Sequence, residues 1–354
     1  MSGKPPEKGK HAREAGHRAV TITDIAQATG VSRATVSLVL RGSPLVNIHT
    51  RARVEVELKR QRYVYNRTAA NLRRRTSSAI ALVINDLSNP FFAEFAAGVD
   101  ETLGEHGYVT LLGSTGESPQ RQLAMLSTLM EHTPNGFILS PAEGSDAQQL
   151  RQVLGTHAHV LLFNRELADA DWDCLTLDNR LGAYRATCHL IERGYRDIAF
   201  FGGHASSSSC EQRRAGYQQA LIEAGLTVHP QWLIESAPNR LDAAARASEV
   251  FAAAEVRPGA AVCYNDTVAL GLMLGLSALG VCPGRDFAVT GFDDIAEAAL
   301  AVPALTTLSA DPRARGQQAA ALLLQRLDDP DAPPVRSVAP VALRVRDSSP
   351  MCSG

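Results

Sequence analysis

Apolar residues near the start of the chain recur at the spacing of short helices. Val36, Val39 and Leu40 are spaced i, i+3, i+4, which predicts one inward face on a short helix. Ser32 stands where its hydroxyl can cap the first turn. Gly30, just before it, supplies the permissive backbone that a tight turn needs. The pattern therefore predicts a helix that begins sharply after a turn.

The segment before this turn reads VTITDIAQATG and predicts another helix. Thr21 and Asp24 are spaced like a capping box, with Asp in place of the usual Glu. We expect Ile25, Ala26 and Ala28 to form its apolar side. Two helices joined by a tight turn at glycine, the second with a polar start, are typical of a helix-turn-helix.

The polar start of the second helix indicates what that helix is for. Small polar residues let a backbone approach DNA, and Arg33 can reach a base edge, since Arg bidentate to guanine is the commonest specific contact. A recognition helix enters the major groove with its N-terminus leading. The residues crowded into this start are Ser32, Arg33, Ala34, Thr35 and Ser37.

Two further helices are expected before the body of the chain. One runs roughly over Ile48–Arg62, begins near Asn47, and turns Val54 and Leu58 inward. The other is short, Asn66–Arg73, and the run of arginines there follows Leu72, a residue with little core to enter.

The remainder of the chain alternates short apolar runs with helical patterns. This order predicts βαβ units and a parallel sheet, and two successive sets predict two doubly wound α/β lobes. The expected strands are Ile80–Ile84, Val109–Leu112, Phe137–Leu139, Val160–Phe163, Leu175–Leu177, Ile198–Phe201, Ala261–Cys263 and Phe287–Gly291.

Polar segments follow several of these strands. They read NDLSNPFF, FNRE, YND and FDD, and ligands of doubly wound sheets bind at the carboxyl ends of the strands. Asp and Asn bind hydroxyls, Arg binds carboxylates or hydroxyls, and aromatic rings cover apolar ring faces. The pattern predicts a cleft between two lobes that takes a small polar ligand.

Charge divides the chain in the same place as the patterns. Residues 1–76 hold 16 Lys/Arg against 5 Asp/Glu, whereas residues 77–354 hold 19 against 32. A basic head on an acidic body indicates a polyanionic partner for the head.

Other classes of protein find little support. No apolar run approaches the ~20 residues of a membrane helix, and the polar N-terminus has no signal-peptide core. The six cysteines are scattered with no CxxC pair, which favours reduced thiols in the cytoplasm. No P-loop, G-x-S-x-G or metal-ligand spacing occurs, and FGGHASSSSCEQ reads as a flexible polar loop. We expect no enzyme, metal or cofactor.

The segments VTITDIAQATGVSRATVSLVL, YNRTAANLRRRTS and IALVINDLSNPFFAEFAAGVDE resemble the LacI/GalR family of bacterial transcriptional regulators, and the resemblance runs from Val20 to about Arg346. It implies a dimer whose paired hinge helices lie in the minor groove, with Leu72 wedging a base step apart. The base-reading pair falls on Arg33 and Ala34, while Leu38 replaces an Arg of other members. The expected DNA contacts are Thr21, Ser32, Arg33, Ala34, Thr35, Ser37, Asn66, Asn71 and Leu72.

The same resemblance implies a body like the periplasmic binding proteins. Asp178 is a weaker match than the other cleft residues, and SAPNR stands where members often place a further aromatic ring. The effector contacts that carry over are Phe91, Phe92, Asn164, Asp178, Arg213, Asn265 and Asp293.

Each cleft residue also has a structural alternative. Phe91 and Phe92 could belong to the core. The pairs Asn265–Asp266 and Asp293–Asp294 could cap helices, and Arg213 with Arg214 could be a surface pair.

The predicted protein is a bacterial, cytoplasmic, nucleoid-associated repressor. It would bind a palindromic operator in double-stranded DNA as a homodimer and respond to a sugar or sugar acid, as inducer or corepressor. One alternative is a solute-binding protein for transport, which the missing signal peptide and the basic head oppose. The other is a sugar-processing enzyme such as a kinase, which the lack of a phosphate loop or catalytic cluster opposes. The expected divisions are a disordered basic arm (1–19), the helix-turn-helix (20–64), hinge helix and linker (65–76), body (77–346; lobe 1 about 77–178 and 309–336, lobe 2 about 179–308 and 337–346) and a frayed tail (347–354).

Overall fold

The computed structural model describes residues 20–40, 42–63, 78–252 and 257–352. The chain divides into two compact units, a head (Met1–Thr76) and a body (Ser77–Gly354). The predicted arm at 1–19 and the predicted hinge residues Asn66, Asn71 and Leu72 lie outside the described residues.

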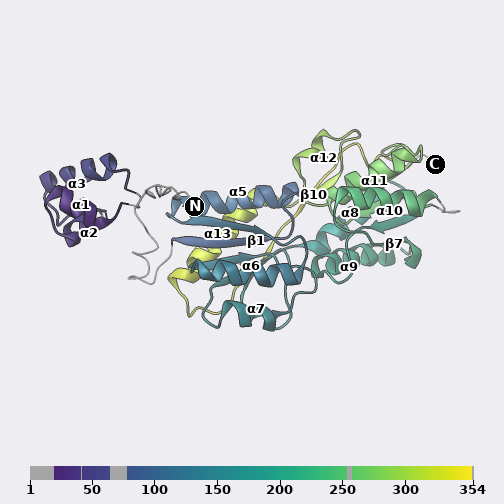
Figure 1. Cartoon of the computed structure of the whole chain (residues 1–354). Coiled ribbons are helices and arrows are strands. Elements are labelled where there is room, and N and C mark those ends of the chain that lie inside the picture. Colours follow the sequence, from purple (N-terminus) through teal and green to yellow (C-terminus); the bar gives the residue numbers. More distant parts are fainter. Residues whose placement is uncertain (1–19, 41, 64–77, 253–256, 353–354) are drawn as a thin grey trace, which may run out of the picture. The chain divides into compact units, whose positions relative to one another are not determined.

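The described part of the head contains the three helices α1 (Ile22–Thr29), α2 (Arg33–Leu40) and α3 (Ile48–Arg60) (Figure 1). One buried residue from each helix meets in its core: Ile25, Val36 and Val54, all 0% exposed. The helix-turn-helix prediction is confirmed at this level.

The predicted caps of the head are also present. The Thr21 hydroxyl accepts from the Asp24 amide, and the Asp24 carboxylate accepts from the Thr21 amide at 2.8 Å. Gly30 ends α1 with φ +67°, a left-handed conformation that glycine adopts without strain. The Ser32 hydroxyl accepts from the Thr35 amide at 3.1 Å and so caps α2.

One assignment in α1 was wrong. Ala28 is exposed, and the buried face of the helix is Ile25, Ala26 and Thr29. Helical periodicity allows either Ala28 or Thr29 to follow Ile25 inward, because both lie within a turn of it. Thr29 turns inward because its hydroxyl bonds to the Ile25 carbonyl at 2.7 Å, which satisfies its polar atom inside the helix.

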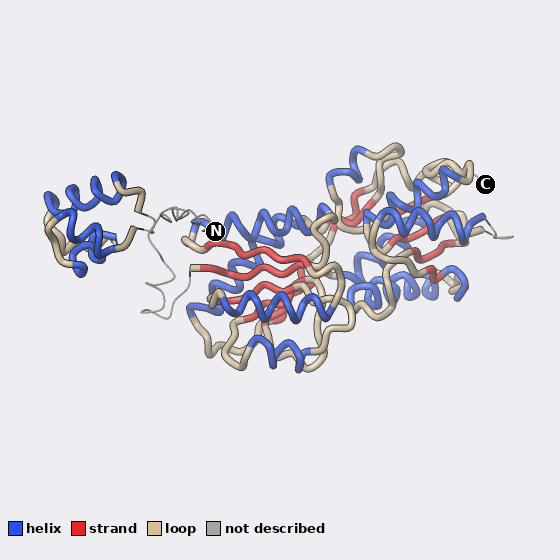
Figure 2. Tube along the Cα trace, viewed as in Figure 1, coloured by secondary structure: helices blue, strands red, loops and turns tan. Residues whose placement is uncertain are grey.

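Lobe 1 of the body is built on a six-stranded parallel sheet in the order β11-β5-β4-β3-β1-β2 (Figure 2). Successive residues of β1 face opposite sides of the sheet: Leu82 joins the cluster under α5 and α13, and Val83 joins the cluster under α6 and α7. The elements are β1 (Ala79–Ile84), β2 (Val109–Ser114), β3 (Gly136–Leu139), β4 (Val160–Phe163), β5 (Asp173–Leu177), β11 (Arg336–Ala339), α5 (Pro90–Glu105), α6 (Pro119–Glu131), α7 (Ala147–Leu154) and α13 (Pro312–Asp328).

Lobe 2 repeats this plan with a four-stranded parallel sheet in the order β7-β6-β8-β9. Adjacent residues of β6 again separate the two faces: Phe200 meets Tyr217 of α9, and Phe201 meets Phe251 of α10. The elements are β6 (Ile198–Phe201), β7 (Leu233–Ile234), β8 (Ala260–Cys263), β9 (Ala288–Thr290), α8 (Asn179–Glu192), α9 (Ser208–Glu223), α10 (Arg240–Ala252), α11 (Asp266–Ala278), α12 (Ala296–Leu300) and the short 3₁₀ helix η1 (Pro230–Trp232).

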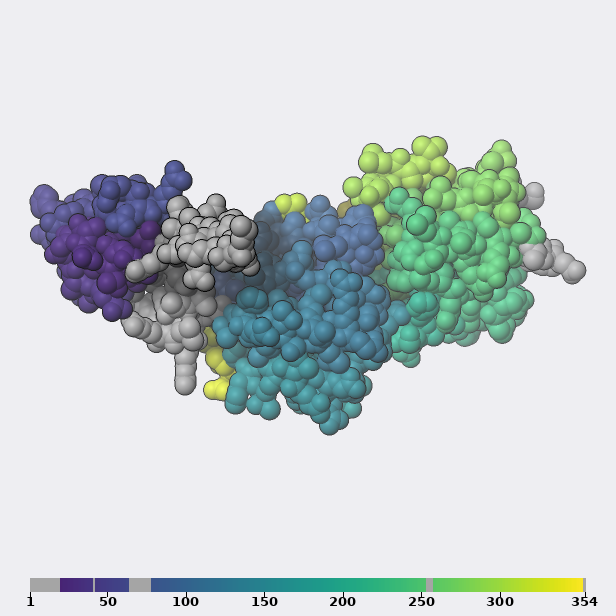
Figure 3. All heavy atoms as spheres, viewed as in Figure 1, coloured from purple at the N-terminus to yellow at the C-terminus, as the bar shows by residue number. Residues whose placement is uncertain are grey.

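The chain crosses between the lobes after β5, β10 and β11. β10 (Thr307–Ser309) pairs with β12 (Ala342–Arg344) in an antiparallel ribbon beside lobe 2. We expected the last crossing after residue 336, but β11 pairs with β5 in lobe 1, so the crossing follows Ala339. The segment Arg336–Ala339 is short and mixed in polarity, and an edge strand of this kind gives little periodic signal in the sequence. Figure 3 shows the two lobes in contact over one face of the body.

The prediction of a frayed C-terminal tail is wrong for residues 347–352. Ser348 and Ser349 are buried. The Ser348 hydroxyl donates to the Val289 carbonyl at 2.6 Å and accepts from the Thr306 amide at 2.8 Å. The Cys352 amide donates to the Arg193 carbonyl at 2.7 Å. Polar composition alone indicated a loose end, but these bonds tie residues 347–352 to lobe 2.

Helices α8 and α9 approach so closely at Gly216 that an added Cβ would lie 2.0 Å from the Arg180 carbonyl oxygen. We expect Gly216→Ala to lower the free energy of unfolding by about 1–3 kcal/mol, since backbone must move to admit the methyl group. Thermal or urea unfolding of the full chain measures this.

Gly104 of α5 provides the control, because an added Cβ there meets nothing within 4 Å. Gly104→Ala should be neutral or stabilising by about 0.5–1 kcal/mol, from the lower helix propensity of glycine. Equal stability of the Gly216 variant and wild type would show that the α8–α9 approach is not tight.

Candidate functional site

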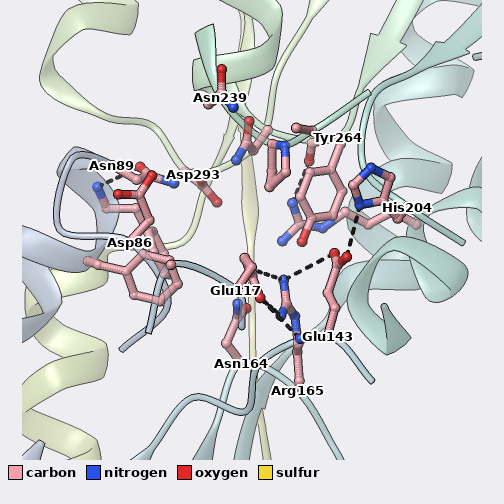
Figure 4. A pocket seen from close by; sticks show the side chains of 17 residues that line it. Asp86, Asn89, Glu117, Glu143, Asn164, Arg165, His204, Asn239, Tyr264 and Asp293 are labelled. Carbon is pink, nitrogen blue, oxygen red and sulfur yellow. Dashed lines mark hydrogen bonds and ion pairs between the residues drawn. The ribbon is translucent and has the colours of Figure 1, made fainter. Parts of the chain in front are cut away.

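The polar segments that follow the strands meet in one cavity between the lobes of about 330 Å³ (Figure 4). Its size lies at the lower end of the range for small-molecule sites. Six of the seven predicted effector residues line it. The lining residues are Asp86, Asn89, Phe91, Phe92, Gly116, Glu117, Glu143, Asn164, Arg165, His204, Arg213, Ala237, Pro238, Asn239, Tyr264, Asn265 and Asp293.

The aromatic wall comes from the first turn of α5. Phe91 stacks against Phe163 with ring centroids 6.0 Å apart, and it meets Phe92 edge to face at 5.3 Å. Both α5 rings belong to the lobe 1 core and also line the cavity. A core position is therefore compatible with the predicted effector contact of Phe91 and Phe92, because the core itself supplies the cavity wall.

Arg165 is the centre of a buried ion pair in lobe 1. Its guanidinium binds the Glu117 carboxylate through both terminal nitrogens, at 2.7 and 2.8 Å, and donates to the Pro141 carbonyl at 3.0 Å. Such a fork is the strongest geometry for an Arg–carboxylate pair. It fixes the loops after β2, β3 and β4 relative to one another.

A hydrogen bond between Glu143 and His204 spans the cleft. Glu143 follows β3 in lobe 1, and His204 follows β6 in lobe 2; Nδ1 of the imidazole lies 2.9 Å from Oε2 of the carboxylate. The other oxygen of Glu143 lies 3.7 Å from Nη2 of Arg165. The contact therefore joins the two lobes at the edge of the cavity (Figure 4).

Arg213 of α9 provides the cationic wall of lobe 2. Nε donates to Oδ1 of Asn179 at 2.8 Å, and Nη1 donates to the Tyr264 carbonyl. The guanidinium lies 3.5 Å from the centroid of the Phe292 ring. At 3% exposure, Arg213 is not the surface residue that one interpretation of the sequence allowed.

Two carboxyls, Asp293 and Asp266, are buried at this side of the cavity; Asp293 lines it and Asp266 does not. Burial raises the pKa of each above its ordinary value; repulsion from Asp266 adds to the rise at Asp293, and repulsion from Asp294 adds to the rise at Asp266. Arg213 opposes the rise at Asp293. Asp266 accepts from the Ile295 amide at 2.9 Å and from Thr307, so it holds the loop that carries Asp293 against β10.

Asn265 and Asn164 combine structural and cavity positions. The Asn265 side chain caps α11 by accepting from the Val268 amide at 2.8 Å, and Asn265 also lines the cavity. Asn164 has φ +68°, which Asn tolerates better than most residues. Its buried Oδ1 has no hydrogen-bond partner.

Asp178 is the predicted effector residue that the structure does not bring to the cavity. Its side chain caps α8 by accepting from the Leu181 amide at 3.3 Å. The next residue, Asn179, turns inward instead and binds Arg213. β5 ends at Leu177 and α8 begins at Asn179, so the alternation of side chains along the strand does not extend to these two residues.

Several lining residues were missed, although the rule used for the others would have found them. Glu117, Glu143, His204 and Tyr264 all follow strands, as the predicted residues do. The aromatic ring expected near SAPNR is replaced by small and polar residues, and Tyr264 after β8 contributes a ring to the wall.

The start of α2 presents the predicted DNA-reading residues. Ser32, Arg33 and Ala34 are exposed, and Thr35 and Ser37 are half-buried. Ser32 and Thr35 share a hydroxyl hydrogen bond of 2.9 Å, and Thr21 is engaged in the α1 capping box. The exposed set lies on one turn with Arg33 at its first position.

Within the described residues, no cluster of His, Cys, Asp and Glu could hold a metal ion. No described helix is long and apolar enough to cross a membrane. The described part of the chain contains a helix-turn-helix and a cavity between two lobes.

Comparison with known proteins agrees with both parts. Residues 21–66 match the bacterial regulatory proteins of the lacI family, and residues 187–349 match a periplasmic binding protein-like domain. The HTH-type transcriptional repressor PurR of Vibrio campbellii is 32% identical over 87% of this chain and 92% of its own length. The maltose regulon regulatory protein MalI of Escherichia coli is 33% identical over 81% and 82%.

Solved structures show the same fold. A lac repressor dimer bound to operator and an anti-inducer has a TM-score of 0.83 at 23% identity, with 94% of this chain and 100% of that chain covered. A complex of the transcriptional regulator CelR with cellobiose has a TM-score of 0.69 at 27% identity, with 93% and 99% covered.

The helix-turn-helix and the cavity between two lobes define a ligand-responsive DNA-binding regulator of transcription rather than an enzyme. The chain belongs to the lacI family of bacterial regulatory proteins. The predictions of fold class and of regulatory function are confirmed, and neither the transport protein nor the kinase remains as an alternative.

Proposed function

We propose that this regulator is a repressor that binds a palindromic operator as a homodimer and responds to a sugar or related small polar metabolite in the cleft. The observation that carries the ligand class is the cavity wall, where side chains from both lobes combine aromatic rings with amide, carboxylate and guanidinium groups. This combination suits a polyhydroxylated ring. The CelR complex with cellobiose and the maltose regulon protein MalI support it by analogy.

The proposed division of labour follows the chain. Residues 20–64 read the operator, 65–76 link the head to the body, and 77–346 bind the effector, in the cytoplasm. Ligand binding would shift the population of lobe arrangements, because side chains of both lobes line one cavity. A hinge between lobes at the chain crossings is one of the common ways to convert binding into a switch. A ligand that favours either arrangement fits, as inducer or corepressor.

A screen of sugars and sugar derivatives tests the proposal directly. Thermal shift identifies ligands of the full chain, and fluorescence anisotropy on operator DNA selected by the full chain measures their effect. We expect at least one sugar to stabilise the body and change operator affinity. Stabilisation only by ligands without hydroxyl groups would contradict the proposed ligand class.

The family resemblance, rather than the described structure, assigns Leu72 to a wedge in the central base step. Under this proposal Leu72→Ala should weaken operator binding on the order of tenfold or more, since the bend that the wedge supports is lost. Nonspecific binding depends on phosphate contacts and should remain nearly unchanged.

Three measurements on that variant distinguish the wedge from a packing role. Operator affinity and the circular-permutation bend angle should both fall, while the melting temperature stays that of wild type. A lowered melting temperature with an unaltered bend would exclude the wedge.

A further inference from the structure

The cleft contains more carboxyl groups than cationic ones. Four carboxyl groups line the cavity of about 330 Å³, against two guanidinium groups and one imidazole. A ligand can use only those charged groups that are not already bound to other groups of the protein. The carboxyls are Asp86, Glu117, Glu143 and Asp293, and the others are Arg165, Arg213 and His204.

Arg165 has its terminal nitrogens engaged within lobe 1, and its remaining nitrogen, Nε, is buried without a hydrogen-bond partner. Both of its terminal nitrogens bind Glu117, and Nη1 also donates to the Pro141 carbonyl. The side chain is 5% exposed. An incoming carboxylate or phosphate would have to displace Glu117 and leave that carboxylate unpaired in the cleft wall, which is costly.

Arg213 is committed in a similar way. Nε binds Asn179 and Nη1 binds the Tyr264 carbonyl, which leaves Nη2 as the nitrogen that can serve a ligand. Its positive charge already acts on Asp293, the neighbouring carboxyl of the cavity wall. The N–H groups that remain free lie beside this carboxyl, so a neutral hydroxyl or ether oxygen is a better partner for them than a second anion.

Among the lining residues, two buried acceptors lack a hydrogen-bond partner, against one buried donor, Nε of Arg165. Oε1 of Glu143 is buried without a hydrogen-bond donor, although Arg165 Nη2 lies 3.7 Å away. Oδ1 of Asn164 is also buried without one. Buried acceptors gain most from a partner that brings donors, because an unsatisfied buried acceptor is destabilising.

We infer that the effector of this cleft is an uncharged, donor-rich polyol such as a neutral sugar, and that the cleft rejects the corresponding sugar acids and sugar phosphates. The inference rests on the proposed function and narrows its ligand class. An anion would add negative charge beside Glu143 and Asp86 in a partly desolvated cleft, where like charges repel strongly. It would also lose its own hydration, and the guanidinium groups nearby already act on the carboxyls of Glu117 and Asp293.

Matched ligands that differ only in charge test the inference. Calorimetry with the full chain compares neutral aldoses, the aldonates derived from them and their 6-phosphates, and Arg213→Ala identifies binding in the cleft. We expect the neutral member of a binding set to bind at least about 100-fold more tightly than either anion. An aldonate or phosphate that binds as tightly as its aldose, and in an Arg213-dependent manner, would overturn the inference and leave the proposed function intact.

The absence of Arg213-dependent binding by every member of the panel would be a different failure. It would contradict the sugar proposal itself, and the inference with it. The two failures are therefore separate outcomes of one experiment.

A charge variant tests the role of Glu143. Glu143→Gln keeps the size of the side chain and removes its charge. The ratio of the affinity for the neutral ligand to that for the anion should therefore fall about tenfold. Glu235→Gln makes the same change outside the cavity, where Glu235 pairs with Arg214 at 3.0 Å, and should leave the preference unchanged. An equal preference in the Glu143 variant and wild type would contradict the electrostatic basis of the selection.

Discussion

Replacing Arg213 by alanine should abolish the effector response and leave operator binding intact. We expect the variant to bind the effector about 100-fold more weakly, or by about 2.7 kcal/mol, since hydrogen bonds to a charged group are worth about 1.5–3 kcal/mol. The loss has two parts: the direct donor from Arg213 disappears, and Asn179 and the Tyr264 carbonyl lose their partner. Calorimetry with the effector and anisotropy with operator DNA measure the two functions separately.

Arg214→Ala is the matched control for this prediction. Arg214 is the next residue in α9 but pairs with Glu235 and does not line the cavity. The Arg214→Ala variant should bind the effector as wild type does and should keep the effector-dependent change in operator affinity. Asp293→Asn gives a second, isosteric change in the cavity wall, in case Arg213→Ala unfolds the body. Unchanged effector affinity in both cavity variants would remove these residues from the binding site.

Arg33→Ala should relax the choice of base at one position of each half-site. Arg33 begins α2 and is exposed beside Ser32 and Ala34. Loss of a bidentate contact to guanine costs about 1–3 kcal/mol in discrimination at each half-site, so a dimer loses twice that. Selection of binding sites from random DNA, with variant and wild type side by side, measures the base preference.

Arg53→Ala removes the same charge from the same small domain at an exposed position of α3. If Arg53 meets only phosphate or solvent, binding should weaken equally for all sequences and base preference should not change. Identical selected sites for the Arg33 variant and wild type would show that Arg33 does not read a base.

The periodic parts of the fold could be predicted from the sequence, and the reasons are local. The strand at residues 160–163 and the helix that begins after Asn47 each carry their signal within a few residues, as apolar runs and caps. β11 and the docked C-terminus carry no such signal. Their places depend on partners far away in the chain, such as the pairing of Ser337 with Leu175 and of Ser349 with His189.

The candidate site divides in the same way. Residues that follow strands could be assigned to the cleft because the carboxyl ends of parallel strands meet there. Which of two adjacent residues turns inward could not be assigned, as Asp178 and Asn179 illustrate. The contact between Glu143 and His204 requires the spacing of the two lobes, which no local pattern encodes.

The most direct test of the whole account is the affinity of the full chain for its selected operator, measured with and without a saturating concentration of the effector found by calorimetry. We expect the effector to change the operator affinity of wild type at least tenfold, in either direction, and to leave that of Arg213→Ala unchanged. An operator affinity that stays the same while the ligand saturates the wild-type cleft would contradict the coupling between cleft and head.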